Sequence, residues 1–311
     1  MVTETAFLTA GSTNYLPGLI AFLNSLVYYK HTEDVLLLSF RLPEEFLSRL
    51  KEYPFNIRVI ESPSKDQIEG TAIERFKVAA DYGKEYKAIA FLEGDICLTG
   101  NVENFFEAAK REVIITGSNG MIVNFGKGYQ KQYNLYLDTD DYVYPNVHTT
   151  VPIFLSSKDL DWFSEFYKGR MSARSFDDVF GLNLLGIKMG KSKRMIAMPP
   201  TTFTQIHHFG IKPVTGLIRK GDLLLDGFEQ QVFMIHGKWW DWGWYSGLMD
   251  PMEGYFHDNA FGDRQRKLAL YSRDITLQEF VKHAYRKEFS IRDFEKIEWL
   301  EKKIVEKGWK T

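Results

Sequence analysis

The segment that decides the fold is Ala88-Ile-Ala-Phe-Leu-Glu-Gly-Asp-Ile-Cys-Leu-Thr-Gly-Asn101. Its apolar start has the length of one buried strand, and two carboxylates, Glu93 and Asp95, follow with Gly94 between them. In α/β sheets, ligands bind beyond the carboxyl ends of the strands. Carboxylates placed there suit a hard divalent cation, which can keep positions open for phosphate oxygens. The segment therefore predicts a metal site, although two acids in a turn can equally serve only to cap it.

Strand and helix patterns alternate on both sides of this segment. Short apolar runs predict strands, and apolar residues at helical spacing predict the helices between them. The predicted strands are 5–9, 35–40, 56–60, 87–92, 113–116, 151–155 and 232–235; the predicted helices are 16–27, 43–53, 71–82, 101–109 (capped by Asn101), 159–167 and 176–185; and 129–144 and 203–226 are predicted loops. Such alternation predicts an α/β fold with a mostly parallel central sheet flanked by helices.

The tail carries two helix starts, Thr-Leu-Gln-Glu and Ser-Ile-Arg-Asp, which both resemble capping boxes. They predict helices over 276–287 and 290–307, with a mixed-charge surface. The predicted organisation is therefore a main domain over 1–260 and a C-terminal helical appendage over 261–311.

The composition excludes several classes of protein. Of 311 residues, 44% are hydrophobic and 26% charged, so the chain can bury a large core. The formal net charge of -2 gives no basic field for generic nucleic-acid binding. Cys97 is the only cysteine, which excludes an internal disulfide and fits a reducing compartment. Because we see no signal peptide and no apolar run of the roughly 20 residues that cross a membrane, we expect a cytoplasmic protein.

Two segments resemble the GT-A glycosyltransferases. The run Phe91-Leu-Glu-Gly-Asp-Ile-Cys-Leu-Thr-Gly-Asn-Val-Glu-Asn-Phe-Phe106 looks like their Asp-x-Asp region, in particular that of the glycogenin-like family (glycosyltransferase family 8). The N-terminal Thr9-Ala-Gly-Ser-Thr-Asn-Tyr-Leu-Pro-Gly-Leu-Ile-Ala-Phe-Leu-Asn-Ser-Leu26 resembles that family's first strand, nucleotide loop and first helix. Glu93 replaces the family's usual first Asp. The resemblance therefore assigns Glu93 and Gly94 to the donor site, and makes Asp95 a safer metal ligand than Glu93.

This resemblance implies a Rossmann-like GT-A domain that moves a hexosyl or pentosyl unit from a nucleoside-diphosphate sugar, expected to be a UDP-sugar. It implies Mn²⁺ or Mg²⁺, which would neutralise the departing diphosphate as a Lewis acid. It places Tyr15 near the nucleobase and Thr9, Ala10, Gly11 and Ser12 along the base and ribose. A Gly-Ser turn also lets a ligand approach the backbone closely. The alternative for Tyr15 is an ordinary aromatic residue at a helix start.

Further cationic and histidine residues are candidates for the site. Arg75 and Lys77 lie on the helix before the acidic strand, where a solvent-exposed face is the default and diphosphate contact the alternative. GT-A enzymes with this motif often use a late His after a strand as a metal ligand. We favour His236, which directly follows a predicted strand, over His208, whose surroundings look closer to the family pattern but lack two residues of spacing. Lys238 would then contact the diphosphate.

The remaining acidic cluster is Ser175-Phe-Asp-Asp-Val-Phe-Gly-Leu-Asn183. Carboxylates are favourable at a helix start in any case. The cluster also resembles the Glu-Asp motif that supplies a base in many inverting GT-A enzymes, which makes Asp178 the predicted catalytic base and Asp177 its alternative. The glycogenin-like family has Asp-Gln in a comparable position, where it holds the sugar. Retention and inversion both stay open.

Two other functions stay open as well. A sugar nucleotidyltransferase of related fold uses the same acidic pair, but normally has a Gly-rich loop with a basic signature, and the loop Ala10–Tyr15 has no Arg or Lys. A non-catalytic carbohydrate-binding protein on the same fold is disfavoured weakly, by Asp95 and His236. The acceptor is not identified: a glycan, a lipid-linked sugar, a protein and a modified nucleic-acid base all remain.

Overall fold

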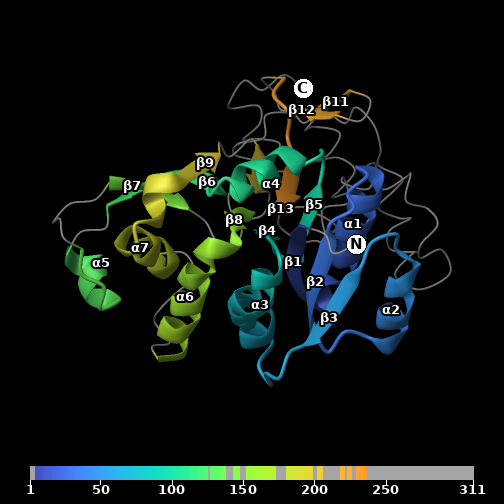
Figure 1. The fold of residues 1–311 in the computed structure, drawn as a ribbon, viewed down its shortest axis with the longest axis horizontal. Helices are drawn as coiled ribbons and strands as arrows, with labels where there is room; N and C mark the ends of the chain where they lie inside the picture. The colour runs from blue at the N-terminus through green and yellow to red at the C-terminus, as the bar shows by residue number, and fades with distance from the viewer. Residues whose placement is uncertain are drawn as a thin grey trace, which may run out of the picture. The chain divides into compact units, whose positions relative to one another are not determined.

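The computed structural model describes residues 4–124, 127–137, 143–147, 152–172, 180–198, 202–205, 218–220, 223–225 and 229–236. These parts of the chain are drawn in colour in Figure 1. The chain divides into two compact units. The first comprises residues 1–16, 31–94 and 102–203, and the second comprises residues 17–30, 95–101 and 204–311.

The first unit is built on an eight-stranded sheet in the order β3-β2-β1-β4-β8-β6-β7, with β9 paired to β6. Its strands are β1 (Thr5–Ser12), β2 (Asp34–Phe40), β3 (Ile57–Glu61), β4 (Ala88–Phe91), β6 (Ile114–Asn124), β7 (Val143–Val147), β8 (Ile153–Ser156) and β9 (Met195–Met198). Strands β1 to β4 run parallel, as do β6 and β9. Strand β8 is antiparallel to both β4 and β6, and β7 is antiparallel to β6. The predicted α/β fold with a mostly parallel sheet is confirmed.

Helices cover this sheet on both faces. The helices in the described part of the unit are α2 (Glu44–Arg49), α3 (Glu74–Tyr82), α4 (Glu103–Lys110), α5 (Lys127–Gln132), α6 (Leu160–Ser172) and α7 (Phe180–Lys188). Of these, α3 and α6 pack on one face and α4 on the other. A π-helical turn, Glu69–Ile73, leads directly into α3. Strands covered on both faces are buried along their whole length, and every residue of β1 and β2 except Thr5 is buried.

The core of the first unit follows from the alternation of side chains along β1. Leu8 belongs to a cluster on one face that includes Phe76 of α3 and Phe163 of α6. Phe7 points to the other face and meets Phe106 of α4, with ring centroids 5.0 Å apart. Each buried aromatic side chain stabilises the fold by roughly 1.5–3 kcal/mol relative to an exposed one. These contacts fix β1 and β4, the two strands that lead to the pocket described below.

The second unit contains most of α1 (Leu16–Tyr28) and of β10 (Phe203–Gln205), together with β5 (Ile96–Leu98), β11 (Ile218–Lys220), β12 (Leu223–Leu225) and β13 (Met234–His236). A three-stranded sheet has the order β10-β13-β5. Strand β5 is antiparallel to β13, so that His236 lies opposite Ile96. The backbone N–H of Leu98 donates to Ser25 Oγ of α1 at 3.2 Å, which ties β5 to that helix.

Three predictions about elements are wrong. Residues 129–144, predicted as loop, include most of α5 and the start of β7, and residues 203–226 include β10, β11 and β12. Asn101 does not cap α4: the helix begins at Glu103, and Asn101 donates instead to the carbonyl oxygen of Tyr29 at 3.3 Å. These short elements depend on distant partners, which local sequence patterns do not contain.

The predicted tail helices, and the predicted boundary between 1–260 and 261–311, lie outside the described residues and stay predictions. Among the residues that the structure describes, no helix is both long and apolar enough to cross a membrane.

Candidate active site

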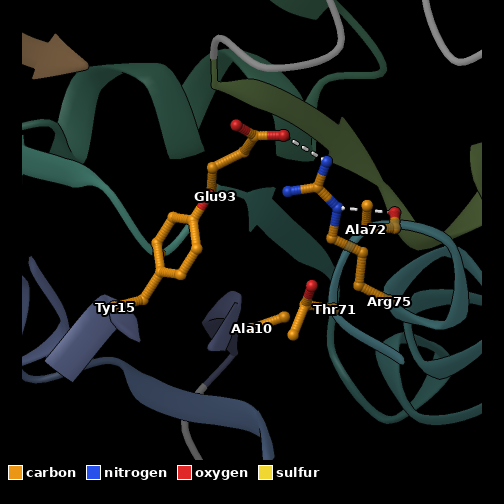
Figure 2. Close-up of a pocket in the computed structure, with 7 residues that line it drawn as sticks. Ala10, Tyr15, Thr71, Ala72, Arg75 and Glu93 are labelled. Atoms are coloured by element: carbon orange, nitrogen blue, oxygen red, sulfur yellow. Dashed lines mark hydrogen bonds and ion pairs between the residues drawn. The ribbon is translucent and has the colours of Figure 1, made fainter. Parts of the chain in front are cut away.

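A pocket opens in the first unit beside the carboxyl ends of β1 and β4. Its lining residues are Ala10, Tyr15, Thr71, Ala72, Arg75, Glu93 and Gly94. They come from β1, the turn after it, the π-helical turn, α3, and the turn after β4. Figure 2 shows the Tyr15 ring on one side and Arg75 with Ala72 on the other. This edge of a parallel sheet is where α/β folds bind ligands.

Arg75 is held rigidly at this pocket. Its side chain is only 2% exposed and forms an ion pair with Glu93 (Figure 2). The guanidinium also donates to the carbonyl oxygens of Ala72 at 3.0 Å and Leu92 at 3.3 Å, and lies 4.8 Å from the ring centroid of Phe91. A buried cation is tolerated when it is paired in this way. The default expectation of a solvent-exposed Arg75 is therefore wrong.

Lys77 lies two residues further along α3 and points elsewhere. Its side chain is 56% exposed and pairs with Asp81 at 3.0 Å. The hydrogen bond from Lys77 to Asp81 and the charge of that carboxylate raise the pKa of the lysine. Residues two apart on a helix point about 200° apart, so only one of Arg75 and Lys77 can face the pocket. The structure brings Arg75 there, and the assignment of Lys77 to the diphosphate stays a prediction.

The residues at the end of β1 divide between pocket and interior. Ala10 and Tyr15 line the pocket, as described above. Thr9 is fully buried, and Gly11 pairs in register with Ser39 of β2. Ser12, the last residue of β1, is buried, and its Oγ accepts a hydrogen bond from Gln67 Nε2 at 2.8 Å. Donor contacts by Thr9, Gly11 and Ser12 stay predictions.

The second unit brings together Asp95 and His236. The pairing of β5 with β13 places His236 opposite the residue that follows Asp95. Nε2 of His236 lies 3.1 Å from Oδ1 of Asp95, and the two side chains are 1% and 5% exposed. His236 is the last residue of β13 rather than the first residue after it. The alternative, His208, lies outside the described residues.

The chemistry of this pair fits a divalent cation. Imidazole nitrogen and carboxylate oxygen both bind such ions at about 2.1 Å, so two ligands at right angles lie about 3.0 Å apart. The observed 3.1 Å between Asp95 and His236 agrees with this separation. The two side chains therefore fit a metal site. Glu93, predicted as a third ligand, is two residues earlier in the chain, where its carboxylate pairs with Arg75.

Three other predicted site residues cannot be placed. Asp177, Asp178 and Lys238 lie outside the described residues, and their roles stay predictions. Sequence reasoning did not predict the lining residues Thr71 and Ala72, and it left a pocket role for Arg75 as an alternative only. The available signal was its position on the helix before the acidic strand, but helical spacing alone does not tell which face of α3 turns inward.

Glycosyltransferases are among the solved structures that resemble this chain. The bifunctional glycosyltransferase WbbM, in an apo structure, matches with a TM-score of 0.53 and 13% identity, over 93% of this chain and 52% of its own. The chain thus spans about half the length of WbbM. An active-site mutant of LgtC matches with a TM-score of 0.50 and 12% identity, over 88% of this chain and 98% of its own. The galactosyltransferase LgtC in complex with donor and acceptor sugar analogues matches with a TM-score of 0.48 and 13% identity, again over 88% of this chain and 98% of its own.

Neither the comparison with protein-family models nor that with curated proteins gives a match. At 12–13% identity the structural likeness concerns the fold. It agrees with the parallel strands β1 to β4. The chain therefore has the GT-A fold of solved glycosyltransferases.

Proposed function

We propose that this chain is a metal-dependent glycosyltransferase that moves a hexosyl or pentosyl unit from a UDP-sugar to an acceptor hydroxyl. The observation that carries the proposal is the buried pair of Asp95 and His236, 3.1 Å apart, on a GT-A fold. A carboxylate and an imidazole buried against one another at the end of paired strands suit a bound cation better than they suit an apolar core.

The proposed metal ligands are Asp95, His236 and Glu93, the last binding either directly or through water. Mn²⁺ or Mg²⁺ held there would act as a Lewis acid on the diphosphate that departs from the sugar. Glu93 enters this set because it precedes Asp95 by only two residues. Its longer side chain, compared with Asp, would let it bind the cation or stay with Arg75. In either arrangement Arg75 stabilises the negative charge of Glu93.

The pocket of the first unit supports the binding of a nucleotide. Tyr15 offers an aromatic face to a base, and Gly94 lets the backbone approach a ligand closely. Arg75 places a fixed positive charge at the same pocket, which favours the phosphates of the donor. Lys238 is a further proposed diphosphate contact, on sequence grounds only. Lys77, which is exposed and pairs with Asp81, would have to leave that carboxylate to reach the diphosphate. The acceptor is not identified, and a glycan, a lipid-linked sugar, a protein and a modified nucleic-acid base all remain candidates.

Thermal unfolding with nucleotide and metal tests the proposal. UDP at 100 times its Kd should stabilise the folded protein by about 2.7 kcal/mol, because a ligand of the native state must shift unfolding. We expect the melting temperature to rise with UDP and Mn²⁺ together, and the effect of UDP to disappear when EDTA removes the metal. Incubation with a panel of UDP-sugars in the absence of an acceptor should then release UDP slowly, with water taking the sugar.

The ligands that stabilise the protein and the products that it releases separate the alternatives. A sugar nucleotidyltransferase would turn over UTP and a sugar 1-phosphate, and release pyrophosphate. A carbohydrate-binding protein would be stabilised by glycans and would not respond to UDP with Mn²⁺. A melting temperature that responds to no nucleoside diphosphate in the presence of Mn²⁺ would contradict the proposed function.

A further inference from the structure

We propose that Gln67 reads the base of the bound nucleotide and selects uracil over cytosine. The inference rests on the proposed function, because it concerns the donor's nucleotide, and it assigns specificity to a residue that sequence patterns did not single out. It starts from one hydrogen bond: Nε2 of Gln67 donates to Oγ of Ser12 at 2.8 Å.

This hydrogen bond joins the two segments that flank the pocket, although they are 55 residues apart in sequence. Ser12 follows the pocket residue Ala10 by two positions and precedes Tyr15 by three. On the other side, the backbone oxygen of Gln67 accepts a hydrogen bond from Oγ1 of Thr71 at 2.6 Å, and Thr71 also lines the pocket. Gln67 and Ser12 are not themselves lining residues, but Gln67 is tied by its side chain to the segment that carries Ala10 and Tyr15, and by its backbone to Thr71.

The burial of the two residues fits their proposed roles, in which Ser12 positions the amide and Gln67 contacts the base. Ser12 is buried at the end of β1, and Gln67 is exposed. A side-chain amide has two N–H donors and one acceptor oxygen, and the bond to Ser12 uses a single N–H. Among the described contacts of Gln67, this leaves one N–H and Oε1 for a ligand. The hydrogen bond to Ser12 restricts the rotation of the amide, and while Nε2 is its donor the remaining N–H and Oε1 keep the orientation that the structure shows.

An amide held in this orientation complements uracil. The edge of uracil has an N3–H donor beside the O4 acceptor, which can meet Oε1 and the remaining N–H of Gln67 in two hydrogen bonds. Cytosine has an acceptor at N3 and an amino donor at position 4, so in this orientation the amide would face donor with donor and acceptor with acceptor. To pair with cytosine, the amide would have to turn over and accept from the Ser12 hydroxyl instead of donating to it. A site that hydrogen-bonds one ligand rejects an analogue that leaves its groups unpaired. For an exposed amide we expect discrimination of about tenfold.

Calorimetric titrations of UDP and CDP, each with Mn²⁺, test the role of Gln67. We expect the parent protein to bind UDP about tenfold more tightly than CDP. Gln67→Ala should bring the ratio of the two Kd values close to one, mainly by weakening the binding of UDP. The matched control is Gln132→Ala, which removes an exposed glutamine of α5 in the same unit and should keep both affinities. Equal melting temperatures of the three proteins without ligand would show that the fold is intact.

A double-mutant cycle tests the role of Ser12 as a positioning residue. Ser12→Ala should lower the UDP to CDP preference when Gln67 is present. It should have no further effect on that preference in the Gln67→Ala background, because Ser12 acts through Gln67. A parent-like preference in Gln67→Ala, or equal affinities of the parent for UDP and CDP, would overturn the inference and leave the proposed function in place. A parent that binds neither nucleotide with Mn²⁺ would contradict the proposed function itself.

Discussion

Asp95 is the residue on which metal binding should depend most strongly. It is buried and lies 3.1 Å from His236, and asparagine keeps its size while removing its charge. We expect Asp95→Asn to abolish the effect of Mn²⁺ on UDP binding, because a neutral amide oxygen is a weaker ligand for a hard cation. Titration calorimetry with UDP, in Mn²⁺ and in EDTA, measures this. An unchanged circular dichroism spectrum provides the control, and parent-like Mn²⁺-dependent binding would refute the assignment.

Asp178 is the residue that we predict to act as the base if the enzyme inverts configuration. Asp178→Asn keeps the size of the side chain and removes its basicity, so turnover should fall by roughly 10²-fold or more while donor affinity stays near the parent value. Initial rates and UDP titrations measure the two effects separately. Asp177→Asn is the matched comparison, since neighbouring residues of the predicted helix 176–185 would point about 100° apart. A product with retained anomeric configuration would remove the need for a base there.

Cys97 should be inert in the folded protein. Burial raises the pKa of its thiol to about 12, against an ordinary value near 9, while a hydrogen bond with Ser25 opposes the shift. At pH 8 we expect no reaction with a disulfide reagent in the native state, and one reactive thiol in denaturant. Rapid labelling of the native protein would contradict the burial.

The same pKa shift predicts a dependence of stability on pH. Above about pH 9 the unfolded chain loses the thiol proton and the folded chain keeps it. This deprotonation stabilises the unfolded state and lowers the free energy of unfolding. The contribution of Cys97 to stability is therefore complete below pH 9 and is lost as the pH rises towards 12. Denaturant midpoints between pH 8 and pH 10 should fall less in Cys97→Ala than in the parent. Equal slopes would show that the thiol does not titrate differently in the two states.

Single residues also show which features of the site can be predicted from the sequence. The turn with Glu93 and Asp95 was predictable, because a buried strand followed by acids is a local pattern. The inward direction of Arg75 was not, since it depends on how α3 packs against β4. Lys77, on the same helix, faces solvent and pairs with Asp81. The choice between these two cations is made by tertiary packing.

At the scale of elements, the π-helical turn Glu69–Ile73 shapes one wall of the pocket. Gly70 allows this turn to pack closely: a Cβ there would lie 2.3 Å from Cδ2 of Phe40 and 2.8 Å from Oγ of Ser62. Since Phe40 is buried, its ring has little room to move. We expect Gly70→Ala to destabilise the protein by about 1–3 kcal/mol and to weaken UDP binding, because Thr71 and Ala72 would be displaced.

The matched control for this substitution is Gly128→Ala in α5, where an added Cβ meets no atom within 4 Å. Alanine has the higher helix propensity, so this variant should be neutral or more stable by up to about 1 kcal/mol. Thermal unfolding of both variants measures the difference, at roughly 2–4 °C for each kcal/mol in a large domain. Equal stability of the two variants would show that the turn can repack at no cost.

Local patterns predicted the early strands well and the later pairing poorly. Residues 35–40 and 87–92 were expected as strands, and β2 and β4 match them to within one residue. The antiparallel pairing of β8 with β4 was not predicted, because strand direction depends on the connecting chain. The pairing of β5 with β13 joins residues more than 130 apart. Such contacts have no signature in either segment alone.

At the scale of the whole molecule, Asp95 and His236 lie far apart in the sequence and meet through β5 and β13. The tail after them should not be required for donor binding. Its predicted helices, 276–287 and 290–307, begin with capping-box patterns and have mixed-charge surfaces, which favour folding as an appendage over chemistry. We therefore expect deletion of residues 290–311 to preserve UDP affinity in Mn²⁺, and to lower solubility or acceptor recognition instead. Circular dichroism and melting temperature establish that the truncated protein is folded, and UDP titration gives its affinity. A folded truncation that no longer binds UDP would show that the tail contributes to the donor site, and the boundary predicted between 1–260 and 261–311 would then have to be abandoned.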